Sequence, residues 1–569
     1  MRVPDIRIRP IAAALLASLL ALATAAHAHD PRAGSDAAPQ AADDLGRLDF
    51  PTSTRSEPAQ AAFERGMLLL HLYEYPDAAK AFQDAQQLDP GFAMAYWGEA
   101  LTATHPLWNQ DNLAMGRAAL AKLAPTPEAR AAKAGSDRER AYLEAAEKLY
   151  GEGTIQARDL AFLQAMEAIA KAWPDDDEAQ LFLAQALLGV TRGERNVDNY
   201  LRAAGIAKAV HARNPRHPGA AHYWIHGMDS PEHAAGALEA ANALSKIAPA
   251  AGHAQHMVSH IYLALGMWDE VASANEQASR VVADSRRTAG LPPAPCGHYT
   301  EWLQYSYYQL GRHRDAQALL DDCAREGGKA VAWLYDHPDH PGQSPEAFER
   351  RIAGSLVLMR AAAVVEAALA RERNGRLPLE TAALARDAGW SAFARGWAAA
   401  STNDPVLARA ELAHLRKIAD EPPGTEEIPR MRERLDILAW LLQARIAEHD
   451  GDLEQAIALA GQASAMQDSL PVDFGPPVAV KPPHEYAGEL LLRAGRADAA
   501  QAEFASSLQS APRRAHSLLG LARANQALGN AEAARKAYEE LAGIWASADA
   551  ELPELAEARD AVRAGTPGD

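Results

Sequence analysis

The sequence predicts an all-α protein built as an array of helix pairs. Ala, Leu, Glu, Gln and Arg dominate the 569 residues and runs of β-branched residues are scarce, so helix is favoured along nearly the whole chain. Residues also recur at a spacing of 34, with His222 repeated as His256 and His226 as His260. A period of 34 residues is typical of helix-turn-helix solenoids, in which each repeat stacks on its neighbours.

The first 28 residues are typical of a secretory signal peptide. Residues 1–10 carry three arginines, an apolar run follows at 11–23, and residues 26–28 form a small-x-small cleavage site. The apolar run is too short for a stable membrane anchor, and no later run approaches a transmembrane length. We therefore expect a periplasmic or secreted protein without integral membrane association. Residues 29–57 lack an apolar period and are expected to form a disordered lead-in.

The charge of the chain disfavours two classes of partner. The formal net charge is -19 at pH 7. An acidic surface repels phosphate backbones and anionic lipid, so we expect neither nucleic acid nor a membrane surface as a partner.

Residues 58–90 show the spacing of one helix pair in more detail. Small residues stand where two helices would cross, bulky residues form the ridge between them, and a proline ends the second helix. These positions are Gly66, Tyr75, Ala78, Phe82, Ala85 and Pro90. In this spacing the chain resembles the tetratricopeptide repeat (TPR) family. The stretches AMAYWGEAL, H-x3-H and GHxxHMxSHIYLxLG are similar, more narrowly, to a group of large exported bacterial TPR proteins without established activity.

The resemblance implies a right-handed α-solenoid of TPR-like helix pairs and divides the mature chain into three parts. Residues 58–335 are expected to form an N-terminal array with a histidine-rich groove. Residues 336–470 are helical with looser repeat spacing. Residues 471–569 begin with a proline-rich loop and end in a clear repeat pair, in which Gly495 and Gly529 stand 34 apart.

Cys296 and Cys323 are the two cysteines of the chain. Aligning Gly311 with Gly266 places Cys296 just before the first helix of a repeat and Cys323 near the end of its second helix. Antiparallel helices bring these two points together, and exported proteins lie in an oxidising compartment. We therefore expect a Cys296–Cys323 disulfide.

The histidines recur with the period of the predicted repeats. In TPR arrays the first helix of each pair lines the concave surface, so the resemblance implies that His222, His226 and their counterparts in the next repeat face one groove. His253 takes another groove position, and the alignment on Gly311 extends the row into the following repeat. The predicted groove set is His222, His226, His253, His256, His260, His298 and Glu301.

Two functions fit such a groove. The sequence favours a scaffold that holds a protein or peptide partner, with the histidines acting as neutral hydrogen-bonding groups. The alternative is a transition-metal site for storage, delivery or catalysis. Packed helices lie about 8–10 Å apart, so imidazoles from two HxxxH helices can converge on copper or zinc. In that case Glu301 adds a carboxylate or orients an imidazole ring.

Common catalytic motifs are missing from the sequence. No GxSxG or Walker A motif is present, and no GxGxxG occurs in a strand-turn-helix context. Each HxxxH lacks the glutamate of HExxH, because Tyr223 and Met257 follow the first histidine. We therefore expect no catalytic residues and no organic cofactor, and an enzyme only if the histidine groove is itself the active site.

Overall fold

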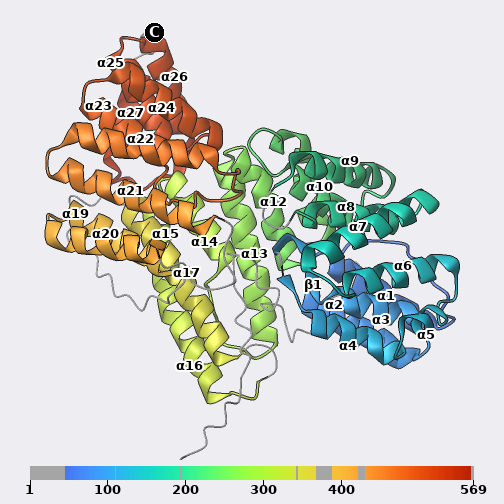
Figure 1. Ribbon diagram of the computed structural model, residues 1–569. Helices are drawn as coiled ribbons and strands as arrows, with labels where there is room; N and C mark the ends of the chain where they lie inside the picture. Colours follow the sequence, from blue (N-terminus) through green and yellow to red (C-terminus); the bar gives the residue numbers. More distant parts are fainter. Residues whose placement is uncertain are drawn as a thin grey trace, which may run out of the picture.

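The chain folds into consecutive helices, most of which pack against the next (Figure 1). Two short strands, β1 (Thr104–His105) and β2 (Gln110–Asp111), pair antiparallel. The expected all-α solenoid of helix pairs is confirmed. The computed structural model describes residues 45–108, 110–191, 195–340, 344–366, 387–420 and 430–564.

The described helices fall into three groups along the chain, coloured blue to green, green to yellow and orange to red in Figure 1. The N-terminal group contains α1 (Glu57–His71), α2 (Tyr75–Leu88), α3 (Ala93–Leu101), α4 (Leu113–Leu123), α5 (Pro127–Ala131), α6 (Asp137–Leu149), α7 (Ile155–Ala172), α8 (Asp177–Gly189), α9 (Val197–Arg213), α10 (Pro218–Met228) and α11 (Leu238–Ile247). The central group contains α12 (Gly252–Ala264), α13 (Trp268–Thr288), α14 (His298–Gln309), α15 (His313–Asp322), α16 (Gly328–Asp336) and α17 (Pro345–Glu366). The C-terminal group contains α19 (Ala388–Ser401), α20 (Pro405–Asp420), α21 (Met431–His449), α22 (Leu453–Ser469), α23 (Pro483–Arg493), α24 (Ala497–Ser510), α25 (Ala515–Ala527), α26 (Ala531–Ile544) and α27 (Pro553–Ala564).

Small residues let the helices of neighbouring pairs approach a shared aromatic ring. A Cβ atom added at Gly66 would lie 2.6 Å from the Phe82 ring, and one at Gly98 would overlap the same ring. Phe82 on α2 is therefore wedged between α1 and α3. Phe504 on α24 lies in the same way against Gly520 on α25. Gly66 and Phe82 thus meet at the helix crossing expected from the repeat spacing.

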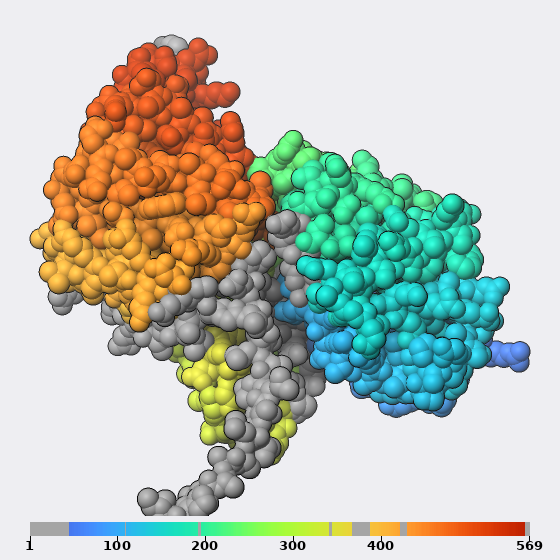
Figure 2. Space-filling view, in the orientation of Figure 1, coloured from blue at the N-terminus to red at the C-terminus, as the bar shows by residue number. Residues whose placement is uncertain are grey.

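The C-terminal group returns to the centre of the chain. Gly266 ends α12 with φ +65°, and a side chain there would overlap the backbone at Pro512. The Trp268 Nε1 donates to the Arg513 carbonyl at 2.8 Å, and the Trp545 Nε1 donates to the Gln309 carbonyl at 3.0 Å. The array is therefore closed on itself: in Figure 2 the orange and red part of the surface meets the green part.

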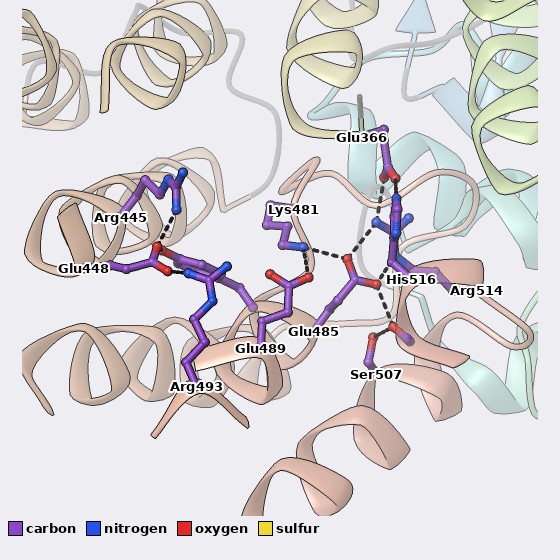
Figure 3. A network of polar contacts seen from close by, with 12 residues as sticks. Glu366, Arg445, Glu448, Lys481, Glu485, Glu489, Arg493, Ser507, Arg514 and His516 are labelled. Carbon is purple, nitrogen blue, oxygen red and sulfur yellow. Dashed lines mark hydrogen bonds and ion pairs between the residues drawn. The ribbon is translucent and has the colours of Figure 1, made fainter. Parts of the chain in front are cut away.

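A buried ionic network stabilises this closure by joining the C-terminal and central groups (Figure 3). The guanidinium of Arg514, at the start of α25, donates to both carboxylate oxygens of Glu485 at 2.7 and 3.0 Å. It also donates to Glu366 on α17 at 2.6 Å and to the Tyr305 hydroxyl on α14 at 3.1 Å. Lys481 reaches the same Glu485 at 2.9 Å. One arginine thus connects α14, α17 and α23.

The structure describes only part of the N-terminal region that precedes the first helix. The signal peptide expected at 1–28 lies outside the described residues, as does the lead-in up to residue 44. Residues 45–56 pack on the core: Leu45 and Phe50 are buried, and Phe50 stacks on Phe63 at a centroid distance of 5.5 Å. This segment contains neither helix nor strand, in keeping with its missing apolar period.

The expected disulfide is confirmed. Cys296 and Cys323 are bonded, with their Cα atoms 5.0 Å apart. The bond ties the loop before α14 to the helical turn after α15. No helix in the described part of the chain combines the length and the apolar character needed to cross a membrane.

Candidate metal centre

Three neighbouring helices bring the predicted histidines together. His222 and His226 lie one turn apart on α10, and His253, His256 and His260 lie along α12. His298 begins α14. The 34-residue register therefore becomes spatial alignment, and six imidazoles gather in two adjacent triads.

The first triad is centred on His222. The His226 Nε2 lies 3.0 Å from the His222 Nε2, and the His253 Nε2 lies 3.1 Å from that same atom. The His222 Nδ1 donates to the backbone carbonyl of His71 at 2.7 Å. Because a carbonyl can only accept, the proton of the neutral ring is on Nδ1 and the Nε2 lone pair faces the other two imidazoles. At most 8% of any of the three residues is exposed.

The second triad consists of His256, His260 and His298. The His256 Nε2 and His260 Nε2 are 3.1 Å apart, and the His256 and His298 ring centroids are 4.7 Å apart. The two triads are neighbours, since the His226 and His260 ring centroids are separated by 6.2 Å.

In the second triad, hydrogen bonds at Nδ1 fix the proton positions of His256 and His260. The His260 Nδ1 lies 2.7 Å from a carboxylate oxygen of Asp229. The His256 Nδ1 lies 2.6 Å from the Asn275 side-chain oxygen, and the Asn275 amide nitrogen donates to the Val271 carbonyl at 2.9 Å. Both Nδ1 atoms are therefore donors. A carboxylate or carbonyl behind a histidine is the usual arrangement around a metal ligand, because it fixes the ring and leaves Nε2 to bind the ion.

This arrangement makes an ordinary hydrogen bond between the paired Nε2 atoms unfavourable. A neutral imidazole has one N–H, and in His256 and His260 it is on Nδ1. Two lone pairs then face each other at 3.1 Å. A cation between them removes the repulsion. Two nitrogen ligands at 2.0–2.1 Å from a tetrahedral zinc ion stand about 3.3–3.4 Å apart, close to the observed separation.

Burial keeps four of the six imidazoles neutral, those of His222, His226, His253 and His256. It lowers the pKa of His222 to about 3, and neighbouring imidazoles oppose its protonation further. Burial, reinforced by neighbouring imidazoles, also lowers the pKa of His226, His253 and His256 well below the usual range. Neutral imidazole is the form that binds a metal ion, so the rings are prepared as ligands near pH 7.

A third cluster, formed by His71, Glu178 and His217, has a different chemistry. The His71 Nε2 and His217 Nε2 lie 2.6 and 2.8 Å from the two carboxylate oxygens of Glu178. Burial disfavours the Glu178 carboxylate, but the two imidazoles hold its pKa below the usual range. Here a carboxylate oxygen already faces the Nε2 atom of each ring. The cluster joins α1, α8 and α10, and it places the His71 carbonyl behind His222.

Glu301, the remaining member of the predicted groove set, lies on the wall of a neighbouring cavity together with His226, His260 and His298. Its carboxylate is not a member of either triad. Tyr305, one turn further along α14, accepts a hydrogen bond from Arg514.

Sequence reasoning missed Asp229 and Asn275, which orient the second triad. Asp229 directly follows α10, and Asn275 lies on α13, the second helix of its pair. Neither position belongs to the row of residues that faces a repeat groove. The sequence signal for Asn275 was a polar residue on the apolar face of the helix that becomes α13. In the structure this residue is fully buried.

Fold and site together define a class: a helical-repeat protein with a histidine-rich centre formed by α10, α12 and α14. No family model and no curated protein matches the chain. The chain is similar to solved helical-repeat structures at low identity. A human IFIT1 dimer with m7Gppp-AAAA is 13% identical over 91% of this chain and 92% of that chain, with a TM-score of 0.33. Cut9 in its APC/C complex with Hcn1 is 12% identical over 91% and 79%, with a TM-score of 0.30. Yeast Tom70 is 11% identical over 90% and 89%, with a TM-score of 0.23.

Proposed function

We propose that this protein binds two transition-metal ions, one in each histidine triad. The observation that supports this most directly is the 3.1 Å contact between the Nε2 atoms of His256 and His260. The Nδ1 atom of each of these rings is hydrogen-bonded to an oxygen. Imidazole ligands suit zinc and copper, so these are the metals to which we assign the site. The signal-like N-terminus supports export, and we therefore assign metal binding to the periplasm or the extracellular space.

Metal analysis of the exported, untagged protein tests this function. We expect about two equivalents of copper or zinc per chain, because each triad offers three imidazole ligands. The double variant His256→Ala, His260→Ala should lose one equivalent. The matched control, His414→Ala with His449→Ala, also removes two histidines but lies far along the chain on α20 and α21, and should keep both. Wild-type protein without stoichiometric metal would refute the proposal.

A groove for a protein or peptide partner is the second candidate, and the geometry supports it less well. Residues of the loop at 471–480 share a cavity wall with the histidine helices, and the Phe474 ring lies 6.2 Å from the His260 ring. The chain's own loop thus lies in the space that a partner would need. If the wild-type protein contains no metal, a groove for a protein or peptide partner becomes the better-supported function.

A further inference from the structure

A cavity of about 350 Å³ adjoins the two triads. His260 and His298 of the second triad and His226 of the first lie on its wall. The other walls come from the N-terminal, central and C-terminal helix groups, so the closure of the array forms the cavity. Sites for small molecules commonly measure about 300–1,000 Å³. The volume therefore fits a small molecule beside the proposed metal site.

Aromatic rings from all three helix groups line this cavity. Trp108 comes from the turn after β1, Trp302 from α14 and Trp390 from α19, and Phe474 comes from the loop at 471–480. The Trp302 ring lies 4.4 Å from the His260 ring. Such rings hold a flat aromatic ligand by stacked and edge-to-face contacts.

The charges on the cavity wall balance one another. The wall contains three arginines and three carboxylates, so its formal charges sum to zero. Arg434 donates to both oxygens of Asp473 at 2.5 and 2.7 Å, and Glu366 accepts from Arg514 at 2.6 Å. A charged ligand would lose its hydration without meeting a net opposite charge. The charged wall residues are Arg195, Arg430, Arg434, Glu301, Glu366 and Asp473.

We propose that the cavity binds a small uncharged aromatic molecule whose nitrogen or oxygen atom coordinates the metal of the second triad. The proposal rests on the metal site proposed above. Sites with three histidine ligands leave a fourth position open for water or substrate. Because His260 and His298 face the cavity, the fourth donor would come from the cavity side.

Cobalt-loaded protein provides the test, because the visible spectrum of Co²⁺ changes when a new ligand joins it. We expect 4-phenylpyridine to change the spectrum and to bind at least tenfold more tightly than isonicotinate, which has the same donor ring but carries a charge. Ala362→Trp, on the cavity wall, should abolish the change while leaving the cobalt content unaltered. Phe474→Ala, on a half-exposed loop, should weaken 4-phenylpyridine binding several-fold without affecting folding.

The outcomes separate this proposal from the one before it. Protein that takes up no cobalt refutes the metal site and this inference with it. Protein that binds cobalt but whose spectrum is unaffected by 4-phenylpyridine refutes only the ligand. Preferential binding of isonicotinate contradicts an uncharged ligand, and an equal spectral change in Ala362→Trp shows coordination from outside the cavity.

Discussion

The Asp229 carboxylate holds the His260 ring in the orientation that a metal ligand requires. It accepts from the His260 Nδ1 at 2.7 Å, and both residues are 4% exposed or less. A carboxylate behind an imidazole also raises the basicity of its Nε2. The single hydrogen bond therefore fixes both the direction and the strength of one ligand.

We expect Asp229→Asn to weaken metal binding at the second triad by about 10–100-fold, the usual effect of removing such a partner. Chelator competition on wild-type and variant protein measures the change. Asp284→Asn, which removes an exposed carboxylate of α13, serves as the control and should bind as the wild type does. Unchanged affinity in Asp229→Asn would mean that His260 is not a ligand.

His484 gives the C-terminal array a predictable response to pH. Its ring lies 2.7 Å from Glu503 and 3.0 Å from Asp468, and the bond to Glu503 raises its pKa above 6.5 despite partial burial. A raised pKa in the folded state means that the stabilisation is complete below about pH 6.5 and is lost as the pH rises through the folded value.

The melting temperature of His484→Gln should therefore lie below that of the wild type at pH 6, and the gap should close towards pH 9. Parallel calorimetric scans across this range measure the gap. A difference that stays constant with pH would show that the charge of His484 contributes nothing.

At the scale of helices, close approach depends on glycines that face an aromatic ring. A methyl group at Gly520 on α25 would overlap the Phe504 ring of α24. Gly543 on α26 has no atom within 4 Å of the position that a Cβ would take. These two glycines lie on the two helices of one repeat, and only Gly520 faces an aromatic ring.

We expect Gly520→Ala to lower the free energy of unfolding by about 1–3 kcal/mol, as overpacking usually does. Gly543→Ala should leave it unchanged or raise it by up to about 1 kcal/mol, because alanine favours the helix. Urea titration of both variants measures the two changes. Equal effects would show that the ring is not wedged between the helices.

The repeat register accounts for the alignment of the histidine helices, because side chains at equal positions of stacked repeats share a face. It could not predict Asp229, which lies beyond the end of α10, because loop positions have no fixed place in a repeat. The same holds for the fully buried Glu485, whose partner Arg514 is 29 residues away in the chain. Long-range pairing of this kind leaves no periodic trace in a sequence.

At the scale of the molecule, the Arg514 network keeps the array closed around the cavity. The side chains of Arg514, Glu366 and Glu485 are 1% exposed or less. A buried charge that loses its partner is costly, commonly by about 3–5 kcal/mol. Closure, and with it the cavity beside the second triad, should therefore depend on this arginine.

We expect Arg514→Met to destabilise the protein by roughly 3–5 kcal/mol and to increase its radius of gyration in small-angle X-ray scattering, because the C-terminal group separates from α14 and α17. The control is Arg523→Met on the same helix, whose partner Glu557 lies at the surface. It should cost less than about 1 kcal/mol. A compact Arg514→Met protein would contradict this account of the closure.

Anomalous X-ray diffraction at the copper and zinc absorption edges tests the central claim most directly. We expect two peaks, one bounded by the Nε2 atoms of His222, His226 and His253 and the other by His256, His260 and His298. Crystals of the exported protein without a peak at either triad, or with metal only at surface histidines, would contradict it.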